Sequence, residues 1–311
     1  MQFNPKYCLP SLDDYGIAAL KVLIFAAFIV LGWGLVNKLT GFDDHQALVV
    51  EHNVSYTLER VGLVFGQAIA FTSLLDPKTD PQSDFAWLGG GGVWILAVLL
   101  FVRTIASRLI AADGPGETAT AANAGKTAHG ARGGNGARGG RTVDRTLSVG
   151  LVRGSFYVAS GMVIDAGLSG GAPNLSTGLA STGVFTALGI VILVAAYLIN
   201  GRIRPYRLNE RVREGNVAAA IISSGFIIAL GLVLRNAIYG DFIGWTNSLV
   251  NAAVTAVAAL IVFYVLCFAV NRWVVARATL AEVVADGQEL AAAVVAVALI
   301  AIAIGATVVA I

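Results

Sequence analysis

The sequence is poor in charged residues, cysteine and histidine, and each shortage excludes a class of protein. Charged side chains make up 13% of the 311 residues, whereas hydrophobic ones make up 57%. The mean hydropathy of +0.76 lies outside the range of soluble globular chains. The formal net charge of +2 is nearly balanced, so it predicts no nucleic-acid partner.

Neither cysteine nor histidine occurs in a pattern that supports catalysis or metal binding. Cys8 lies in the N-terminal segment and Cys267 lies within an apolar run, so we expect no disulfide between them. His45, His52 and His129 stand alone in polar stretches, without a nucleophile arranged around them. We therefore predict a protein that is not an enzyme and that has no catalytic residue, metal site or cofactor.

Long apolar runs are what the sequence has in abundance. About 20 apolar residues cross a bilayer as a helix, and such runs cover roughly residues 16–39, 54–75, 85–110, 147–168, 180–200, 216–238, 246–275 and 289–310. The runs are continuous rather than alternating, which excludes a β-barrel, and helices satisfy their own backbone hydrogen bonds in lipid. The sequence predicts an all-α polytopic integral membrane protein with eight transmembrane helices.

The same short lead precedes every second run. It consists of an acidic residue, one spacer and a side chain that can cap a helix, and its copies are Glu51-His52-Asn53, Asp144-Arg145-Thr146, Glu214-Gly215-Asn216 and Asp286-Gly287-Gln288. The recurrence predicts four repeated helical hairpins. Because each hairpin has an even number of helices, its copies keep one orientation across the membrane, which makes the repeat parallel.

Two offsets predict how the chain divides into units. An offset of 163 aligns Asn53 with Asn216, and an offset of 137 aligns Gly150 with Gly287. The offsets differ by 26 residues, which corresponds to a Gly/Ala-rich stretch that is too poor in large apolar residues to order itself. We predict an external N-terminal segment at 1–15, a four-helix unit at 16–168 that contains this flexible cytoplasmic insert at 112–140, and a second four-helix unit at 180–311.

Lys and Arg gather in alternate connections between the runs. They are frequent after the third, fifth and seventh runs, whereas Lys78 is the only basic residue in the connections after the second, fourth and sixth. Because basic loops are retained in the cytoplasm, we predict that both termini are external.

The leads have two interpretations. The residues concerned are Glu51, Asn53, Glu214, Asn216, Asp286 and Gln288. In the first interpretation the amide side chains accept hydrogen bonds from the first helix amides, and the carboxylates favour the positive ends of the helix dipoles. In the second, the four helix starts converge on the cytoplasmic side and form a site for a cation or a partner.

A few charges lie within or beside the apolar runs, where ionisable side chains are costly and often functional. The candidates are Glu59, Arg60, Arg153, Asp165 and Arg235. Asp165 and Arg235 both fall near the external face, where they either pair across two helices or contact a substrate. Arg103 and Arg108 lie near a cytoplasmic helix end, so we expect both to extend to the interface.

Small residues recur within several runs. They are Gly62 and Gly66, Gly150 and Gly154, and Ala218–Ala220 followed by Ser223, Ser224 and Gly225. Such residues let helix backbones approach closely, which drives helix association in lipid; the alternative is a glycine-lined pore. The run Gly89–Gly92 permits either a kink or a very close crossing.

The leads also carry a family resemblance. The sequence Glu214-Gly215-Asn216-Val217-Ala218-Ala219-Ala220 with Gly225, and Phe42-Asp43-Asp44 followed by Glu51-His52-Asn53-Val54 and Gly62, resemble the domain of unknown function 350 family, the YjfL-like bacterial inner-membrane proteins. In the first copy Ser55 and Tyr56 replace small residues of the pattern, and Asp144-Arg145-Thr146 lacks the amide. The resemblance implies two tandem four-helix membrane units in a bacterial inner membrane. It implies no activity, cofactor or catalytic residue.

Two functions fit these observations. The leading hypothesis is a channel or transporter-like protein for a small solute or ion, because the repeat places acidic residues at equivalent helix entrances. The alternative is a non-enzymatic membrane scaffold or stress-response partner whose basic loops recruit a cytoplasmic protein or anionic lipid. Besides the lipid bilayer, the expected partners are a cytoplasmic protein or further copies of the chain in a homo-oligomer.

Overall fold

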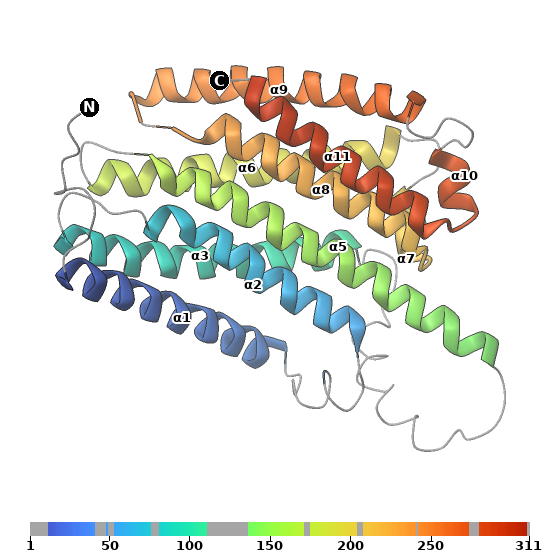
Figure 1. The fold of residues 1–311 in the computed structure, drawn as a ribbon, viewed down its shortest axis with the longest axis horizontal. Helices are drawn as coiled ribbons and strands as arrows, with labels where there is room; N and C mark the ends of the chain where they lie inside the picture. The colour runs from blue at the N-terminus through green and yellow to red at the C-terminus, as the bar shows by residue number, and fades with distance from the viewer. Residues whose placement is uncertain are drawn as a thin grey trace, which may run out of the picture.

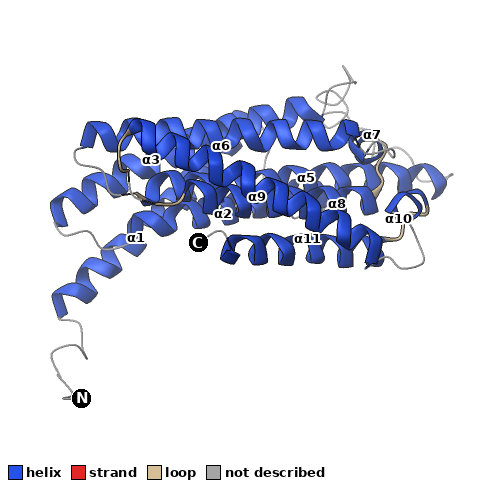
Figure 2. Ribbon diagram, turned by 90° about the horizontal axis from the view of Figure 1, so that it is seen from above, coloured by secondary structure: helices blue, strands red, loops and turns tan. Residues whose placement is uncertain are grey.

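The structure, a computed structural model, describes residues 12–40, 48, 53–75, 81–110, 136–170, 175–203, 208–240, 242–273 and 280–309. These residues form helices joined by short turns, and none of them lies in a β-strand (Figure 2). The long helices are α1 (Leu12–Thr40), α2 (Val54–Leu75), α3 (Pro81–Ile110), α5 (Gly136–Ser169), α6 (Leu175–Ile203), α8 (Val217–Ile238), α9 (Trp245–Trp273) and α11 (Glu289–Val309). Eight helices are long and apolar enough to cross a membrane, which confirms the predicted all-α polytopic architecture.

Two short helices were not predicted. α7 (Leu208–Arg213) precedes α8, and α10 (Leu280–Ala285) precedes α11. Each has six residues, which is less than two turns and too short for an apolar periodicity to indicate. Both lie directly before a lead, so each of these two leads connects a short helix to a long one.

The fourth span begins at Leu147, as predicted, but the helix that contains it begins earlier than the lead indicated. Helix α5 begins at Gly136, so the lead Asp144-Arg145-Thr146 lies inside a helix rather than at its start. The last five residues of the predicted insert, 136–140, are helical too, and 112–135 lie outside the described residues. The apolar run marks only the part of a helix that lipid can cover, because a helix can continue beyond the bilayer into water, where its side chains need not be apolar.

Four long helices form a central row in the order α2, α5, α8, α11 (Figure 1). Each is the second helix of a predicted hairpin. In their apolar windows, 72% of the α5 span and 78% of the α8 span are buried inside the protein, compared with 17% for α1 and 22% for α9. The middle of the row, α5 and α8, is therefore the most buried part of the bundle, and α1 and α9 present most of their apolar surface outward, where lipid would cover it.

Glycine sets the distance between helices of the row, as the small residues predicted. A Cβ on Gly62 would lie 2.3 Å from the Gly154 Cα, so α2 and α5 are in backbone contact. On α8, a Cβ on Gly225 would lie 2.5 Å from the Ala296 Cβ of α11. Close packing between backbones of this kind holds helices together in lipid, where the hydrophobic effect does not drive helices to associate.

These contacts correct the alignment of the two halves. Gly62 and Gly225 are 163 residues apart, as predicted, but their partners Gly154 and Ala296 are 142 apart rather than 137. The predicted offset matched Gly150 to Gly287, which differ in structure. Gly150 packs inside a helix against Ser55, whereas Gly287 is a turn residue with a φ of 64°.

The run Gly89–Gly92 lies within α3, which continues through it. A Cβ on Gly91 would lie 2.6 Å from the Leu74 side chain, and one on Gly92 would lie 2.6 Å from the Phe28 ring. Half of the run therefore serves close packing of α3 against α2 and α1. Gly89 and Gly90 have open space around them.

Candidate functional site

The lead before α8 forms a compact turn between two helices. Gly215 has a φ of 93°, the left-handed conformation that glycine supplies at helix ends. Its amide donates to the Val212 carbonyl at 3.1 Å, and the Asn216 amide donates to the Arg211 carbonyl at 2.9 Å, which together make a Schellman motif. Glu214 therefore ends α7 and does not belong to the first turn of α8.

Asn216 then caps α8. Its Oδ1 accepts a hydrogen bond from the Ala219 amide at 2.8 Å, and its Nδ2 donates to the Val284 carbonyl at 2.6 Å, which ties the start of α8 to α10. Asn53 caps α2 in the same way, because its Oδ1 accepts from the Tyr56 amide at 3.1 Å. The capping interpretation describes both asparagines.

The lead before α11 repeats the turn but not the cap. The Gly287 amide donates to the Val284 carbonyl at 3.4 Å, and the Gln288 amide donates to the Val283 carbonyl at 2.9 Å. The Gln288 side chain, however, donates to Asp286 Oδ2 at 3.5 Å. Glutamine is one methylene longer than asparagine, and short polar side chains make the best caps.

Two of the acidic residues of the leads, Glu214 and Asp286, are exposed. The Glu214 side chain is 62% exposed and lies 3.3 Å from the Arg211 guanidinium, and Asp286 is exposed as well. Glu51 lies outside the described residues. Within the described part of the chain, no three His, Cys, Asp or Glu side chains are grouped so that they could hold a metal ion.

A different set of charges meets between α2, α3 and α5. Glu59 Oε1 lies 3.4 Å from Arg103 Nε, and Glu59 Oε2 lies 3.5 Å from Arg153 Nη1. The Tyr157 hydroxyl donates to Glu59 Oε1 at 3.5 Å. We call these four residues the Glu59 centre. The candidates Glu59 and Arg153 are thus brought together, and Arg103 joins them through its contact with Glu59.

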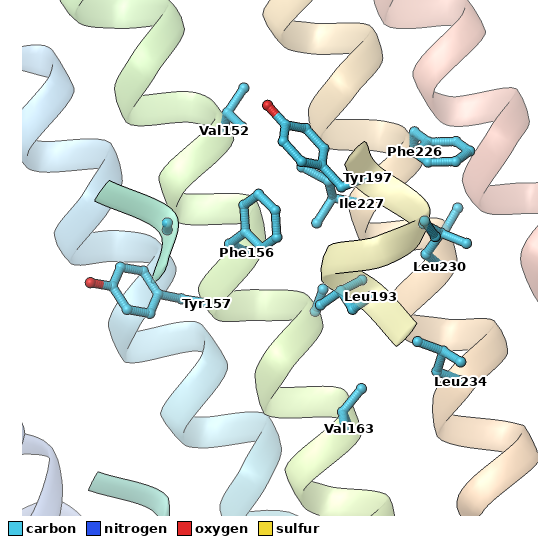
Figure 3. Packing of buried hydrophobic residues seen from close by; sticks show 14 of the residues in the cluster. Val152, Phe156, Tyr157, Val163, Leu193, Tyr197, Phe226, Ile227, Leu230 and Leu234 are labelled. Atoms are coloured by element: carbon cyan, nitrogen blue, oxygen red, sulfur yellow. The ribbon is translucent and has the colours of Figure 1, made fainter. Parts of the chain in front are cut away.

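The Glu59 centre lies inside the apolar spans. Its charged members are five to seven residues from the span ends at Val54, Ile110 and Leu147, or about 8–10 Å along the helices. All three span ends belong to the same side of the bundle, so the charges share one depth. In Figure 3, Tyr157 points away from Phe156, its neighbour on α5, which faces Tyr197 of α6.

Arg60 faces a different neighbour, helix α1. The residue is 2% exposed, and its Nη2 donates to Asn37 Oδ1 and to the Tyr56 hydroxyl. The guanidinium carbon lies 5.5 Å from the Trp33 ring centroid and 4.6 Å from that of Tyr56, distances at which cation–π attraction contributes. Arg60 therefore fastens α1 to α2.

The second half has apolar or small side chains where the first half is charged. With offsets of 163 and 142, the counterparts of Glu59, Arg60, Arg153 and Tyr157 are Ile222, Ser223, Val295 and Leu299. All four counterparts are buried, with exposures of 0%, 1%, 2% and 3%. The counterpart of Arg153 is thus Val295 and not Leu290, as the uncorrected offset predicted.

Asp165 is a buried charge with several short hydrogen bonds. It is fully buried, and its Oδ1 accepts from the Thr72 hydroxyl at 2.6 Å and from the Ser73 amide and hydroxyl at 3.1 and 2.6 Å. Its Oδ2 accepts from Arg235 Nε at 2.7 Å, which is the ion pair that the sequence suggested. We call these four residues the Asp165 junction.

The Asp165 junction joins the two halves of the chain. Thr72 and Arg235 are 163 residues apart, so they are equivalent positions of α2 and α8. Both bind the one carboxylate of α5, which lies between these helices. Arg235 also lies 5.3 Å from the Tyr239 ring. The described contacts of Asp165 all connect helices to one another, so a structural role accounts for them.

Sequence reasoning missed the neutral partners of these charges. Tyr157 and Asn37 look like ordinary residues of apolar helices. A further polar residue in mid-span was also missed, Gln67, whose Nε2 donates to the Phe28 carbonyl at 2.7 Å. The available signal was depth. Glu59 and Arg103 lie five and seven residues inside two consecutive spans, and this similar depth is a signal that favours a contact between opposite charges.

A comparison with protein families gives two tandem matches. The model of a Domain of Unknown Function (DUF350) matches residues 11–134 and 174–310. Glu59 and Arg103 lie in the first match and Arg235 in the second, whereas α5, which carries Arg153, Tyr157 and Asp165, lies between them. No curated protein and no solved structure matched the chain.

Proposed function

This chain belongs to the Domain of Unknown Function (DUF350) family, and on that footing we propose that it is a non-enzymatic membrane protein that transports or conducts a small ion or solute at the Glu59 centre. Charged groups inside membrane spans are costly and mark ion or substrate pathways more often than not. The proposal moves the expected pathway from the helix entrances, where Glu214 and Asp286 are exposed turn residues, to Glu59.

The observation that carries the proposal is the difference between the two halves. Both halves pack their central helices through glycine at equivalent positions, Gly62 and Gly225. Only the first half places Glu59 and Arg153 between those helices, where the second half has Ile222 and Val295. Apolar side chains of similar volume replace buried ion pairs without loss of stability, and often with a gain. The packing of these helices therefore does not require Glu59 and Arg153, which supports a functional role for this pair.

The expected setting is a bacterial inner membrane. We place the side of the bundle at which α2, α8 and α11 begin in the cytoplasm, because the basic connections belong to that side. The Glu59 centre then opens toward the cytoplasm, and the Asp165 junction closes the opposite side. A cysteine at Asn53 and one at Tyr239, labelled from one side of sealed vesicles, would test this orientation.

The experiment is ion flux into proteoliposomes. Wild type is compared with the neutral variant Glu59→Gln/Arg103→Gln/Arg153→Gln, with chloride, phosphate, acetate, potassium and protons tested in turn. We expect flux above that of empty liposomes for wild type and its loss in the variant. Arg211→Gln/Glu214→Gln is the matched control, because it removes an exposed ion pair of the same type and should leave flux unchanged.

Two outcomes would contradict the proposal. One is the absence of flux for every ion with a correctly folded wild-type protein, which would favour a scaffold that recruits a partner through its basic connections. The other is equal flux in the neutral variant and wild type, which would place the pathway elsewhere. Gel filtration and thermal unfolding of each variant establish that it is folded.

A further inference from the structure

We propose that the ligand of the Glu59 centre is a small oxyanion, a carboxylate or phosphate group, which binds Arg103 and Arg153 in place of Glu59. The inference rests on the proposed function and adds the sign and chemical class of the ligand. Glu59 is then an internal competitor that occupies the two guanidinium groups when the ligand is absent.

The first argument is that Glu59 is held loosely. Its contacts to Arg103, Arg153 and Tyr157 are 3.4, 3.5 and 3.5 Å long, whereas a charge-assisted hydrogen bond is usually about 2.7–2.9 Å long. The Asp165 junction, where the same kinds of group meet, has contacts of 2.6 and 2.7 Å. Of these two carboxylates, Asp165 is firmly bound, whereas Glu59 is held loosely enough for another anion to replace it.

The second argument is the number of donors that Glu59 leaves over. Each arginine reaches it through a single nitrogen, although a guanidinium group carries five N–H donors in a planar fork. Arg153 Nε is buried and has no hydrogen-bond partner in the described structure. A tetrahedral or planar oxyanion presents more oxygen atoms than Glu59 can place, and guanidinium forks bind such groups with two parallel hydrogen bonds.

The third argument is charge and access. In the Glu59 centre two guanidinium groups face one carboxylate, so an arriving anion gains attraction and an arriving cation meets a net positive charge. The Arg103 and Arg153 side chains are 28% and 23% exposed. The two guanidinium groups are therefore not sealed inside the protein, in contrast to the fully buried Asp165, and the proposal requires that an ion approach them from the nearer end of the spans.

The test depends on opposite changes in anion affinity: removing the glutamate should raise it, and removing either arginine should lower it. Binding of inorganic phosphate and of acetate to detergent-purified, full-length protein is measured by the shift of the thermal unfolding temperature. Glu59→Gln removes the competitor, so the variant should bind about tenfold more tightly than wild type if Glu59 occupies the arginines about nine-tenths of the time. Arg103→Gln and Arg153→Gln should each bind at least about tenfold more weakly.

Glu59→Asp covers the case in which Glu59→Gln does not fold. It keeps the charge but shortens the side chain, so it should compete less and bind phosphate more tightly than wild type. Glu214→Gln is the matched control, because it makes the same exchange at an exposed carboxylate and should bind as wild type does. An equal shift in every variant would overturn the inference, because it would mean that phosphate acts on the protein surface.

A second arm distinguishes a free anion from a lipid headgroup. Phosphatidylglycerol is added to the detergent in place of phosphate. Stabilisation by both, lost in Arg153→Gln, supports the oxyanion site and makes the lipid a competing occupant, and stabilisation by the lipid alone identifies the headgroup as the oxyanion. If Glu59→Gln instead abolishes potassium or proton flux and Arg153→Gln increases it, the ligand is a cation. The proposed function would then stand without this inference.

Discussion

The two halves of this protein share a backbone arrangement and differ in what they place inside it. Helices α2 and α5 meet around Gly62 and enclose Glu59 and Arg153, whereas α8 and α11 meet around Gly225 and enclose Ile222 and Val295. The second half therefore shows what the fold requires, which is close helix packing and apolar fill. What the first half adds to this is the best guide to function.

The largest effect is expected where the halves are joined. Asp165→Ala would leave Arg235, Thr72 and the Ser73 amide without their acceptor, and we expect a loss of about 3 kcal/mol in the free energy of unfolding. The measurement is unfolding in mixed micelles with increasing denaturing detergent. A loss below about 1 kcal/mol would mean that helix packing alone holds the halves together.

The next effect concerns the packing that the halves share. Gly62→Ala puts a methyl group 2.3 Å from the Gly154 Cα, and Gly225→Ala puts one 2.5 Å from the Ala296 Cβ. We expect each to cost about 2–3 kcal/mol in the same unfolding assay, since the helices must separate. Gly89→Ala is the control, because it meets no atom within 4 Å and should gain up to about 1 kcal/mol from helix propensity.

A sharper comparison converts one half into the other. Glu59→Ile/Arg153→Val, made in an Arg103→Gln background so that Arg103 does not lose its carboxylate, gives the α2–α5 contact the side chains of the second half. We expect the free energy of unfolding to stay level with that background or to rise by about 1–2 kcal/mol. Flux through proteoliposomes should be lost in the same variant. A strongly destabilised double variant would show that the charges are structural, and retained flux would show that they are not the pathway.

The smallest effects are expected at the leads. Asn216→Ala removes a helix cap and the bond to the Val284 carbonyl, and should cost about 1 kcal/mol. Glu214→Gln and Asp286→Asn change exposed turn residues and should each stay within about 0.5 kcal/mol, with flux unchanged. Loss of flux in either acidic variant would restore the hypothesis of a site at the helix entrances.

The sequence predicted the apolar spans well but predicted the helical segments beyond the spans less well. The run 54–75 coincides with α2, and each of the other runs lies on one long helix, although 216–238, 246–275 and 289–310 extend one or two residues beyond α8, α9 and α11. The start of α5 and the existence of α7 and α10 were not predictable, because hydropathy reports the lipid-covered length of a helix and says little about helical turns in water. The leads were recognised as recurrent, but only the φ of Gly215 and Gly287 showed that they join two helices.

The sequence by itself determined the eight spans, the asparagine caps of α2 and α8 and the small residues that let helices touch, since each depends on composition or local spacing. Only the tertiary structure decided which charges meet. Lipid is as apolar as the protein interior, so hydropathy does not distinguish the face of a membrane helix that contacts protein from the face that contacts lipid. The contacts of Glu59 with Arg103 and Arg153, 44 and 94 residues away in the chain, depend on the glycine-set approach of α2 to α5 and on the position of α3 beside them.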